Sequence, residues 1–185
     1  MKAGPGYGGS CFHKDLQALI SFSLHHGYDP VLLRASEETN EEQANRVVAL
    51  SEKLVGPLEA KRIAVLGLAF KKDTDDICEA ASVRVIDRLR KKGANIVAYD
   101  PMAMPSFGNV FGNVIELAKD PHTALKGADC AIVMTEWDEF RRLKAKDYLA
   151  YMREPNVVDA RRIYNPDEYD QLNLVGIGLG SVARI

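Results

Sequence analysis

The sequence is poor in cysteine, and its three cysteines are far apart. Cys11, Cys78 and Cys130 form neither a C-x-x-C pair nor a Cys/His cluster, so neither a disulfide framework nor a zinc site is expected. No other metal site is expected. Isolated thiols of this kind are typical of a reducing compartment, and we expect a cytoplasmic location.

Long apolar runs and an excess of charge are also missing. No stretch approaches the ~20 apolar residues that a membrane-spanning helix needs, and residues 1–5 (M-K-A-G-P) lack the apolar core of a signal peptide. The formal net charge of −2 provides no electrostatic basis for binding nucleic acid or an anionic membrane. The hydrophobic fraction of 46% fits a soluble globular protein.

From Lys61 onward, short apolar segments alternate with amphipathic helical segments. Strands are predicted at residues 62–67, 95–101, 114–117, 130–135, 157–160 and 174–177, and helices at 80–92, 121–127 and 139–151. This alternation predicts an α/β fold with a parallel, doubly wound, Rossmann-like sheet. In such sheets, ligands bind beyond the carboxyl ends of the strands.

The first part of the chain has a different, helical period. Helices are predicted at residues 11–26 and 30–54, with a break at Gly27–Pro30. Two helices of this size do not bury both of their faces alone, so we expect a partner chain or another segment to cover them. We therefore divide the chain into a helical part, residues 1–57, and an α/β domain, residues 58–185.

A glycine-rich stretch at residues 4–15 (G-P-G-Y-G-G-S-C-F-H-K-D) delivers one thiol to the first turn of the first helix. Unpaired backbone N–H groups and the helix dipole favour the thiolate of Cys11, which is the reactive form. Asp15, four residues later, is expected on the same face of the helix. The alternative is that Cys11 is simply a small apolar side chain packed within a helix.

Three further features are expected at the carboxyl ends of the strands. Phe70 and Lys71 follow the first strand, and an aromatic ring beside a cation suits a nucleotide, although a solvated charged loop is the alternative. Asp100 ends the second strand and is a candidate for contact with a ribose hydroxyl or for a turn. Arg161 and Arg162 follow a later strand and are candidates for binding a phosphate.

Three motifs resemble those of the UDP-glucose/GDP-mannose dehydrogenase family. Residues 4–15 resemble its active-site loop G-x-G-[FY]-G-G-S-C-F-P-K-D, and residues 67–76 (G-L-A-F-K-K-D-T-D-D) resemble its G-L-[AS]-F-K-x-x-T-D-D motif. Residues 158–161 (V-D-A-R) resemble its late D-x-R element. Phe12 and the Phe70-Lys71 pair fit the UDP-glucose branch of the family better than the GDP-mannose branch.

The resemblance implies an NAD-dependent oxidoreductase that converts UDP-glucose to UDP-glucuronate at C6 through a cysteine thiohemiacetal and thioester. It makes Cys11 the nucleophile, Asp15 the residue for proton transfer and water activation, and Lys14 a contact of the cofactor. The substrate-binding residues that it implies are Gly6, Tyr7, Gly8, Phe70, Lys71 and Arg161. It also implies a homodimer formed through the long helix at residues 30–55.

The sequence departs from the family in ways that leave two functions open. The N-terminal Rossmann domain of the family is not in this sequence, nor is the segment with its catalytic lysine and asparagine. Cys78 stands where the family commonly has an arginine that touches NAD, and His13 replaces a proline. The near-intact Cys11 loop favours the C-terminal portion of a dehydrogenase that works with a separate NAD-binding domain. Cys78 favours a non-catalytic nucleotide-sugar-binding or dimerisation fragment.

A flavodoxin-like or response-regulator scaffold would also fit the α/β pattern. It leaves the first fifteen residues without an explanation, and similarity of fold carries little information about function.

Overall fold

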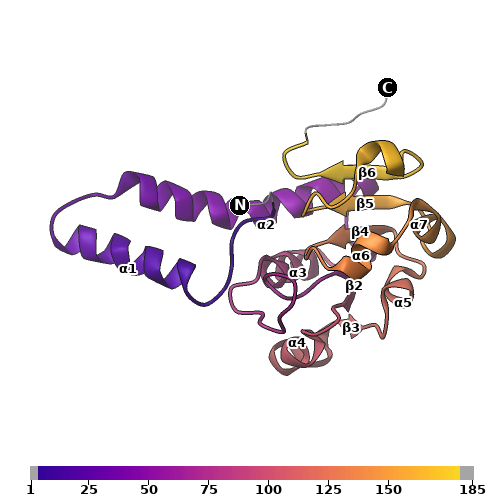
Figure 1. Ribbon diagram of the computed structural model, residues 1–185, viewed down its shortest axis with the longest axis horizontal. Helices are drawn as coiled ribbons and strands as arrows, with labels where there is room; N and C mark the ends of the chain where they lie inside the picture. The colour runs from indigo at the N-terminus through magenta and orange to yellow at the C-terminus, as the bar shows by residue number, and fades with distance from the viewer. Residues whose placement is uncertain (1–3, 180–185) are drawn as a thin grey trace.

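The centre of the molecule is a six-stranded parallel sheet (Figure 1). The computed structural model describes residues 4–179. The strands are β1 (Arg62–Leu66), β2 (Asn95–Tyr99), β3 (Glu116–Leu117), β4 (Cys130–Val133), β5 (Asn156–Asp159) and β6 (Asn173–Gly176). Their order is β3-β2-β1-β4-β5-β6, with every neighbouring pair parallel. This is the strand order of a doubly wound dinucleotide-binding fold, so the predicted fold class is confirmed.

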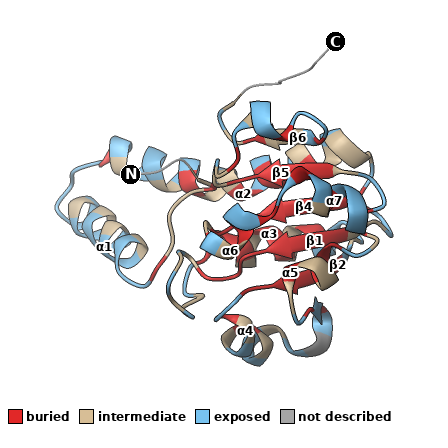
Figure 2. Cartoon of the chain, turned by 45° about the vertical axis from the view of Figure 1, so that its right-hand side comes forward, coloured by how far each residue is buried: buried red, intermediate tan, exposed pale blue. Residues whose placement is uncertain are grey.

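Helices cover both faces of the sheet, because successive side chains of each strand point to opposite faces. On β1, Ile63 and Val65 belong to one core cluster, whereas Ala64 and Leu66 belong to the other, and all four are fully buried. The helices are α1 (Phe12–His25), α2 (Val31–Val55), α3 (Ala81–Lys91), α4 (Met104–Phe111), α5 (Pro121–Leu125), α6 (Asp138–Arg142) and α7 (Ala145–Tyr151). Figure 2 shows the buried strands between these layers.

Two helical predictions need correction. The single helix predicted at residues 139–151 is two helices, α6 and α7, because Leu143 is extended and buried between them. Lys144 then starts α7 with a capping box, in which its backbone N–H donates to Asp147 at 2.7 Å. The helix α4 was not predicted, since Pro105, Gly108 and two phenylalanines in eight residues give it weak helical propensity. The 3₁₀ helices at Gly112–Val114 and Pro166–Tyr169 were not predicted either.

The helices α1 and α2 form a hairpin that projects from the sheet (Figure 1). No residue of α1 is buried, and the buried residues of α2 begin only at Asn40. The C-terminal half of α2 packs on the sheet, where Val47 and Val48 join the same core cluster as Ile63. The projecting half leaves large apolar side chains in solvent: Phe22 is 62% exposed and Leu32 is 82% exposed. The domain boundary at residue 57 stays a prediction. None of the helices among the described residues is long and apolar enough to cross a membrane.

The buried carboxylate of Asp100 connects three loops at the carboxyl ends of the strands. One oxygen accepts the backbone N–H groups of Leu68 (2.7 Å) and Ala69 (3.1 Å), which follow β1, and the indole N–H of Trp137 (3.0 Å), which follows β4. The other oxygen accepts the N–H groups of Met102 (2.9 Å) and Ala103 (2.8 Å), which follow β2. Asp100 is 0% exposed, so water cannot replace its carboxylate as the acceptor for these five donors.

We therefore expect Asp100→Ala to lower the free energy of unfolding by about 3 kcal/mol or more, because it leaves several buried donors unpaired. Urea unfolding followed by circular dichroism measures the loss. Glu38→Ala, which removes an exposed carboxylate from α2, serves as the control and should change the free energy by less than about 0.5 kcal/mol. A loss below about 1 kcal/mol in Asp100→Ala would contradict this account.

Candidate functional site

Arg161 joins three strand ends at the carboxyl edge of the sheet. Its Nε donates to the carbonyl of Met134 after β4 (2.8 Å), and its Nη2 donates to the carbonyl of Phe70 after β1 (2.9 Å). Glu136 lies 3.4 Å from the same Nε, and Gly4 lies against the guanidinium. Burial lowers the pKa of Arg161, while Glu136 opposes this shift. Arg161, predicted to bind the substrate, thus lies at the carboxyl edge of the sheet. Two of its N–H groups already donate to the loops after β1 and β4.

The glycine-rich loop at residues 4–10 is pressed against the rest of the protein. Gly6 has a φ of 96°, and a Cβ there would collide with the side-chain oxygen of Asn40. A Cβ on Gly8 would collide with the carbonyl of Glu79. The glycines therefore serve the internal packing of the loop, a role that the sequence did not reveal.

Asn40 and Glu37 of α2, together with Arg84 of α3, hold Tyr7 in this loop. Asn40 accepts the backbone N–H of Tyr7 at 2.8 Å and donates to its carbonyl at 3.3 Å, and Arg84 donates to the same carbonyl at 3.2 Å. The Tyr7 hydroxyl donates to Glu37 at 3.3 Å. Burial and the charge of Glu37 raise the pKa of Tyr7. Tyr7 is therefore fixed by both its backbone and its side chain.

Glu37 contacts the chain on both sides of Cys11. Besides Tyr7, its carboxylate lies 2.6 Å from Nδ1 of His13, and both of these side chains are only 17% exposed. The ring of Phe12 packs edge-on against the ring of Tyr7, with 4.6 Å between centroids. His13, which departs from the family motif, thus has a specific partner in this protein.

Sequence reasoning missed Asn40 and Glu37. Asn40 is 3% exposed and stands at helical spacing before Ala44 and Val47, both of which are fully buried. A polar side chain in the apolar row of a helix needs a partner, and this was the available signal. Glu37 carried no such signal, because it stands in an acidic segment that is typical of a solvated face.

Cys11 occupies the N-cap position of α1 and is exposed. Its Sγ lies 3.7 Å from the Ser10 hydroxyl. Lys14 and Asp15 share the first turn of the helix, where both are exposed and their charged groups are 3.7 Å apart. Cys11, Lys14 and Asp15 thus lie at the start of one helix, with the Asp15 carboxylate paired to Lys14.

Phe70 and Lys71 extend the site from the loop after β1. The Phe70 ring lies against Gly9, and the exposed Lys71 ammonium is 5.3 Å from the ring centroid, within the range of a cation–π contact. The neighbouring Lys72 instead lies 3.7 Å from Asp73 and 3.6 Å from Asp138.

The acidic residues at the strand ends support loops. Both oxygens of Asp100 are occupied by the five donors described above, which argues against the ribose contact considered from the sequence. Asp159, the last residue of β5, accepts the backbone N–H groups of Arg161 (3.1 Å) and Tyr164 (2.8 Å). Burial raises the pKa of Asp159, against these hydrogen bonds.

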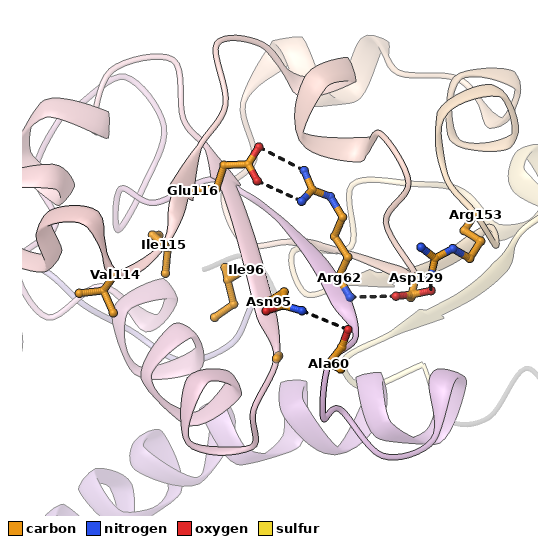
Figure 3. Close-up of a pocket in the computed structure, with 10 residues that line it drawn as sticks. Ala60, Arg62, Asn95, Ile96, Val114, Ile115, Glu116, Asp129 and Arg153 are labelled. Atoms are coloured by element: carbon orange, nitrogen blue, oxygen red, sulfur yellow. Dashed lines mark hydrogen bonds and ion pairs between the residues drawn. The ribbon is translucent and has the colours of Figure 1, made fainter.

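A hollow of about 630 Å³ lies at the opposite, amino edge of the sheet (Figure 3). Its arginines are paired with its own carboxylates: Arg62 holds Glu116 through two contacts of 3.0 and 3.2 Å, and Arg153 lies 2.6 Å from Asp129. Because these charges neutralise each other, and ligands of such sheets bind at the carboxyl edge, this hollow is not the candidate site.

Comparison with known families agrees with this geometry. Residues 64–166 match the model of the UDP-glucose/GDP-mannose dehydrogenase family, UDP binding domain, and residues 1–42 match the model of its central domain. The chain belongs to this family. The Cys11 loop falls in the part matched to the central domain, whereas Phe70, Lys71 and Arg161 fall in the part matched to the UDP-binding domain.

Individual family members are similar over most of the chain. UDP-glucose 6-dehydrogenase TuaD of Bacillus subtilis is 32% identical over 99% of this chain and 40% of its own length. UDP-glucose 6-dehydrogenase AglM of Haloferax volcanii is 44% identical over 87% of this chain and 36% of its own length. A UDP-glucose dehydrogenase structure from Pyrobaculum islandicum has a TM-score of 0.83 at 33% identity, covering 92% of this chain and 37% of that one. The chain thus spans about 40% of the length of these relatives.

The contact between Asn40 and Tyr7 gives a test of how the loop is held. We expect Asn40→Ala to remove the acceptor of the Tyr7 N–H and to speed amide hydrogen exchange in residues 6–9, with a loss of about 1–2 kcal/mol in stability. Asn45→Ala is the matched control, because Asn45 is exposed on the same helix and bonds only to Glu42 among the described residues. Equal exchange rates in the two variants would contradict the assignment.

Proposed function

We propose that this chain provides the nucleotide-sugar-binding domain and the nucleophilic thiol of an NAD-dependent UDP-glucose 6-dehydrogenase. The observation that carries the proposal is the position of Cys11. An exposed thiol stands at the start of α1, at the end of a loop that contacts Phe70 and Arg161 of the matched UDP-binding domain. A nucleotide sugar bound to that domain would therefore extend its sugar toward the thiol.

Charge and shape support specific roles for the residues around the substrate. Lys71 is exposed and lies beside the Phe70 ring, so the pair offers a cation for the diphosphate and an aromatic face for the base. Gly6, Tyr7 and Gly8 form a firmly packed backbone that would border the sugar. Arg161 would act near the phosphates while it holds the strand ends together.

The proposed reaction oxidises the C6 alcohol of the sugar to a carboxylate. Cys11 adds its sulfur to the C6 aldehyde as a thiohemiacetal and later holds C6 as a thioester until water hydrolyses it. Asp15, in the same helical turn, accepts the proton that the attacking water loses. NAD, when bound, supplies the chemistry of accepting hydride from C6.

The described residues fit the edge of a cofactor site better than its centre. The Lys14 side chain is 74% exposed in the turn that carries Cys11, so its ammonium can reach an anionic group beside the thiol. Cys78 stands on the adjoining loop, where the family motif has a cation. These residues would border NAD, and most of its contacts would come from a separate NAD-binding domain.

A second candidate function is a nucleotide-sugar-binding module without catalysis. The observation that favours it is Cys78, since an uncharged thiol replaces the arginine expected beside the cofactor. The two functions share substrate binding and differ in the role of Cys11.

Titration calorimetry with UDP-glucose, GDP-mannose and UDP-N-acetyl sugars tests the shared step. We expect saturable binding of UDP-glucose that Lys71→Ala weakens about tenfold or more, because a contact to a charged group contributes about 1.5–3 kcal/mol. Lys72→Ala is the control and should have a smaller effect, since Lys72 already faces Asp73 and Asp138.

Alkylation of Cys11 by iodoacetamide then separates the two functions. Slower alkylation in the presence of UDP-glucose would support a thiol positioned at the sugar, and an unchanged rate would favour the non-catalytic module. Absence of binding by any of the nucleotide sugars would refute both.

We further propose that the projecting hairpin packs against a second copy of the chain. Its exposed apolar residues support this assembly: Tyr28 is 68% exposed, Val31 is 59% exposed and Leu32 is 82% exposed. Apolar side chains gathered at one end of a molecule are typical of an interface.

We expect the chain to sediment as a dimer in analytical ultracentrifugation and Leu32→Glu to sediment as a monomer, because the interface would bury an unpaired charge. Leu149→Glu provides the control, since Leu149 is 44% exposed on α7, away from the hairpin. A monomeric unmodified chain at concentrations of about 100 μM would refute a dimer of useful affinity.

A further inference from the structure

Cys11 and Cys78 lie on two segments that contact each other directly. Cys11 ends the glycine-rich loop, and Cys78 belongs to the loop between β1 and α3. The backbone N–H of Gly9 donates to the carbonyl of Cys78 at 2.9 Å, and Gly8 packs against the carbonyl of Glu79. Both cysteines are free and exposed.

The length of the chain limits how far apart the two thiols can be. Cys11 is two positions after Gly9, and a stretch of that length spans at most about 7 Å. Residues 10 and 11 form a turn, which shortens this span. A disulfide requires the two Cα atoms to lie about 4.4–6.8 Å apart. The hydrogen bond between Gly9 and Cys78 thus keeps the two thiols on neighbouring exposed segments. A disulfide requires the turn at residues 10–11 to bring the two Cα atoms into this range.

The two thiols differ in their surroundings. Cys11 occupies the N-cap of α1, where no side chain caps the first-turn N–H groups, so these groups remain available to a sulfur anion. Partial desolvation raises the pKa of the exposed Cys78 thiol, and the charges of Asp76, Glu79 and Cys11 itself add to the shift. The influence of Cys11 on Cys78 supports their proximity. The raised pKa favours the protonated form of Cys78, and we assign this thiol the second step.

We propose that Cys11 and Cys78 form a modification site at which hydrogen peroxide generates an intramolecular disulfide. The Cys11 thiolate attacks one peroxide oxygen, the O–O bond breaks, and Cys11 sulfenic acid and hydroxide form. The sulfur of Cys78 then attacks the sulfenic sulfur, an S–S bond replaces the S–O bond, and the hydroxyl group leaves with the Cys78 proton as water. Two thiols are oxidised by two electrons in total, and one peroxide is reduced. A dithiol reductant reverses the reaction.

The disulfide would block and protect the same sulfur. Without a neighbouring thiol, a sulfenic acid reacts with a second hydrogen peroxide to give sulfinic acid and water, and ordinary reductants do not restore the thiol. Cys78, which stands where the family motif has an arginine, would react with the sulfenic acid of Cys11 before that step. This inference does not depend on nucleotide-sugar binding, because it concerns only the two thiols.

Peptide mass spectrometry tests the inference on the full chain. The reduced chain is treated with one equivalent of hydrogen peroxide, the remaining thiols are alkylated, and the protein is digested with trypsin without reduction. We expect the peptide of residues 3–14 joined to the peptide of residues 73–84, with a mass two hydrogens below their sum and with release by dithiothreitol. Cys130 is an internal control that should remain reduced, because burial raises its pKa to about 12.

Two variants make the test decisive. Treated with excess hydrogen peroxide, Cys78→Ser should accumulate Cys11 sulfinic acid that dithiothreitol does not restore, because that step consumes a second peroxide. Cys130→Ala should form the joined peptide as the unmodified chain does. Sulfinic acid at Cys11 in the unmodified chain, without the joined peptide, would overturn the proposal. A joined peptide found only in covalent dimers on a non-reducing gel would overturn it as well. Matching thermal unfolding of the unmodified chain and Cys78→Ser excludes misfolding, since Cys78 is exposed.

Discussion

The carboxylate of Asp100 holds the carboxyl ends of β1, β2 and β4 together. A buried charge is stable only when its hydrogen-bonding capacity is filled, and here four backbone N–H groups and one indole N–H fill it. Arg161 repeats the arrangement with the opposite charge, since its guanidinium donates to carbonyls that follow β1 and β4. The strand ends at the candidate site are therefore fixed by one buried ionic group, Asp100, and one partly buried group, Arg161. The loops that they hold carry the residues proposed to contact the substrate.

The position of the Cys11 thiol follows from this fixed edge. The glycine-rich loop lies against Arg161, Phe70 and Glu79 of the sheet domain on one side and against Asn40 of α2 on the other. Since the C-terminal half of α2 packs on the same sheet, both surfaces belong to one core. The loop has no buried core of its own, and its conformation depends on these contacts. Its glycines thus keep the thiol in place by permitting close approach of the backbone.

The two ends of the sheet show why charge alone does not identify a site. The amino edge carries Arg62 and Arg153 around a hollow, but each arginine is paired with a carboxylate that lines the same hollow. At the carboxyl edge, Lys71 is exposed beside an aromatic ring. The distinction lies in pairing, which depends on which residues the topology brings together. A count of basic residues along the chain would treat the two edges alike.

The sequence by itself determined the fold class, the order of the main elements and the family, because apolar periodicity and short motifs are local properties. The motifs also identified the loop, the thiol and the Phe70-Lys71 pair as candidates. Only the tertiary structure decided that Asp100 and Asp159 support loops, that Asn40 and Glu37 hold the segment around Cys11, and that Cys78 lies beside it. The contacts of Tyr7 with Asn40 and Glu37, and of Leu68 with Asp100, join residues separated by 30 or more positions. Such residues meet only after the strands have paired in the order β3-β2-β1-β4-β5-β6, and no local pattern encodes which of them then share a hydrogen bond.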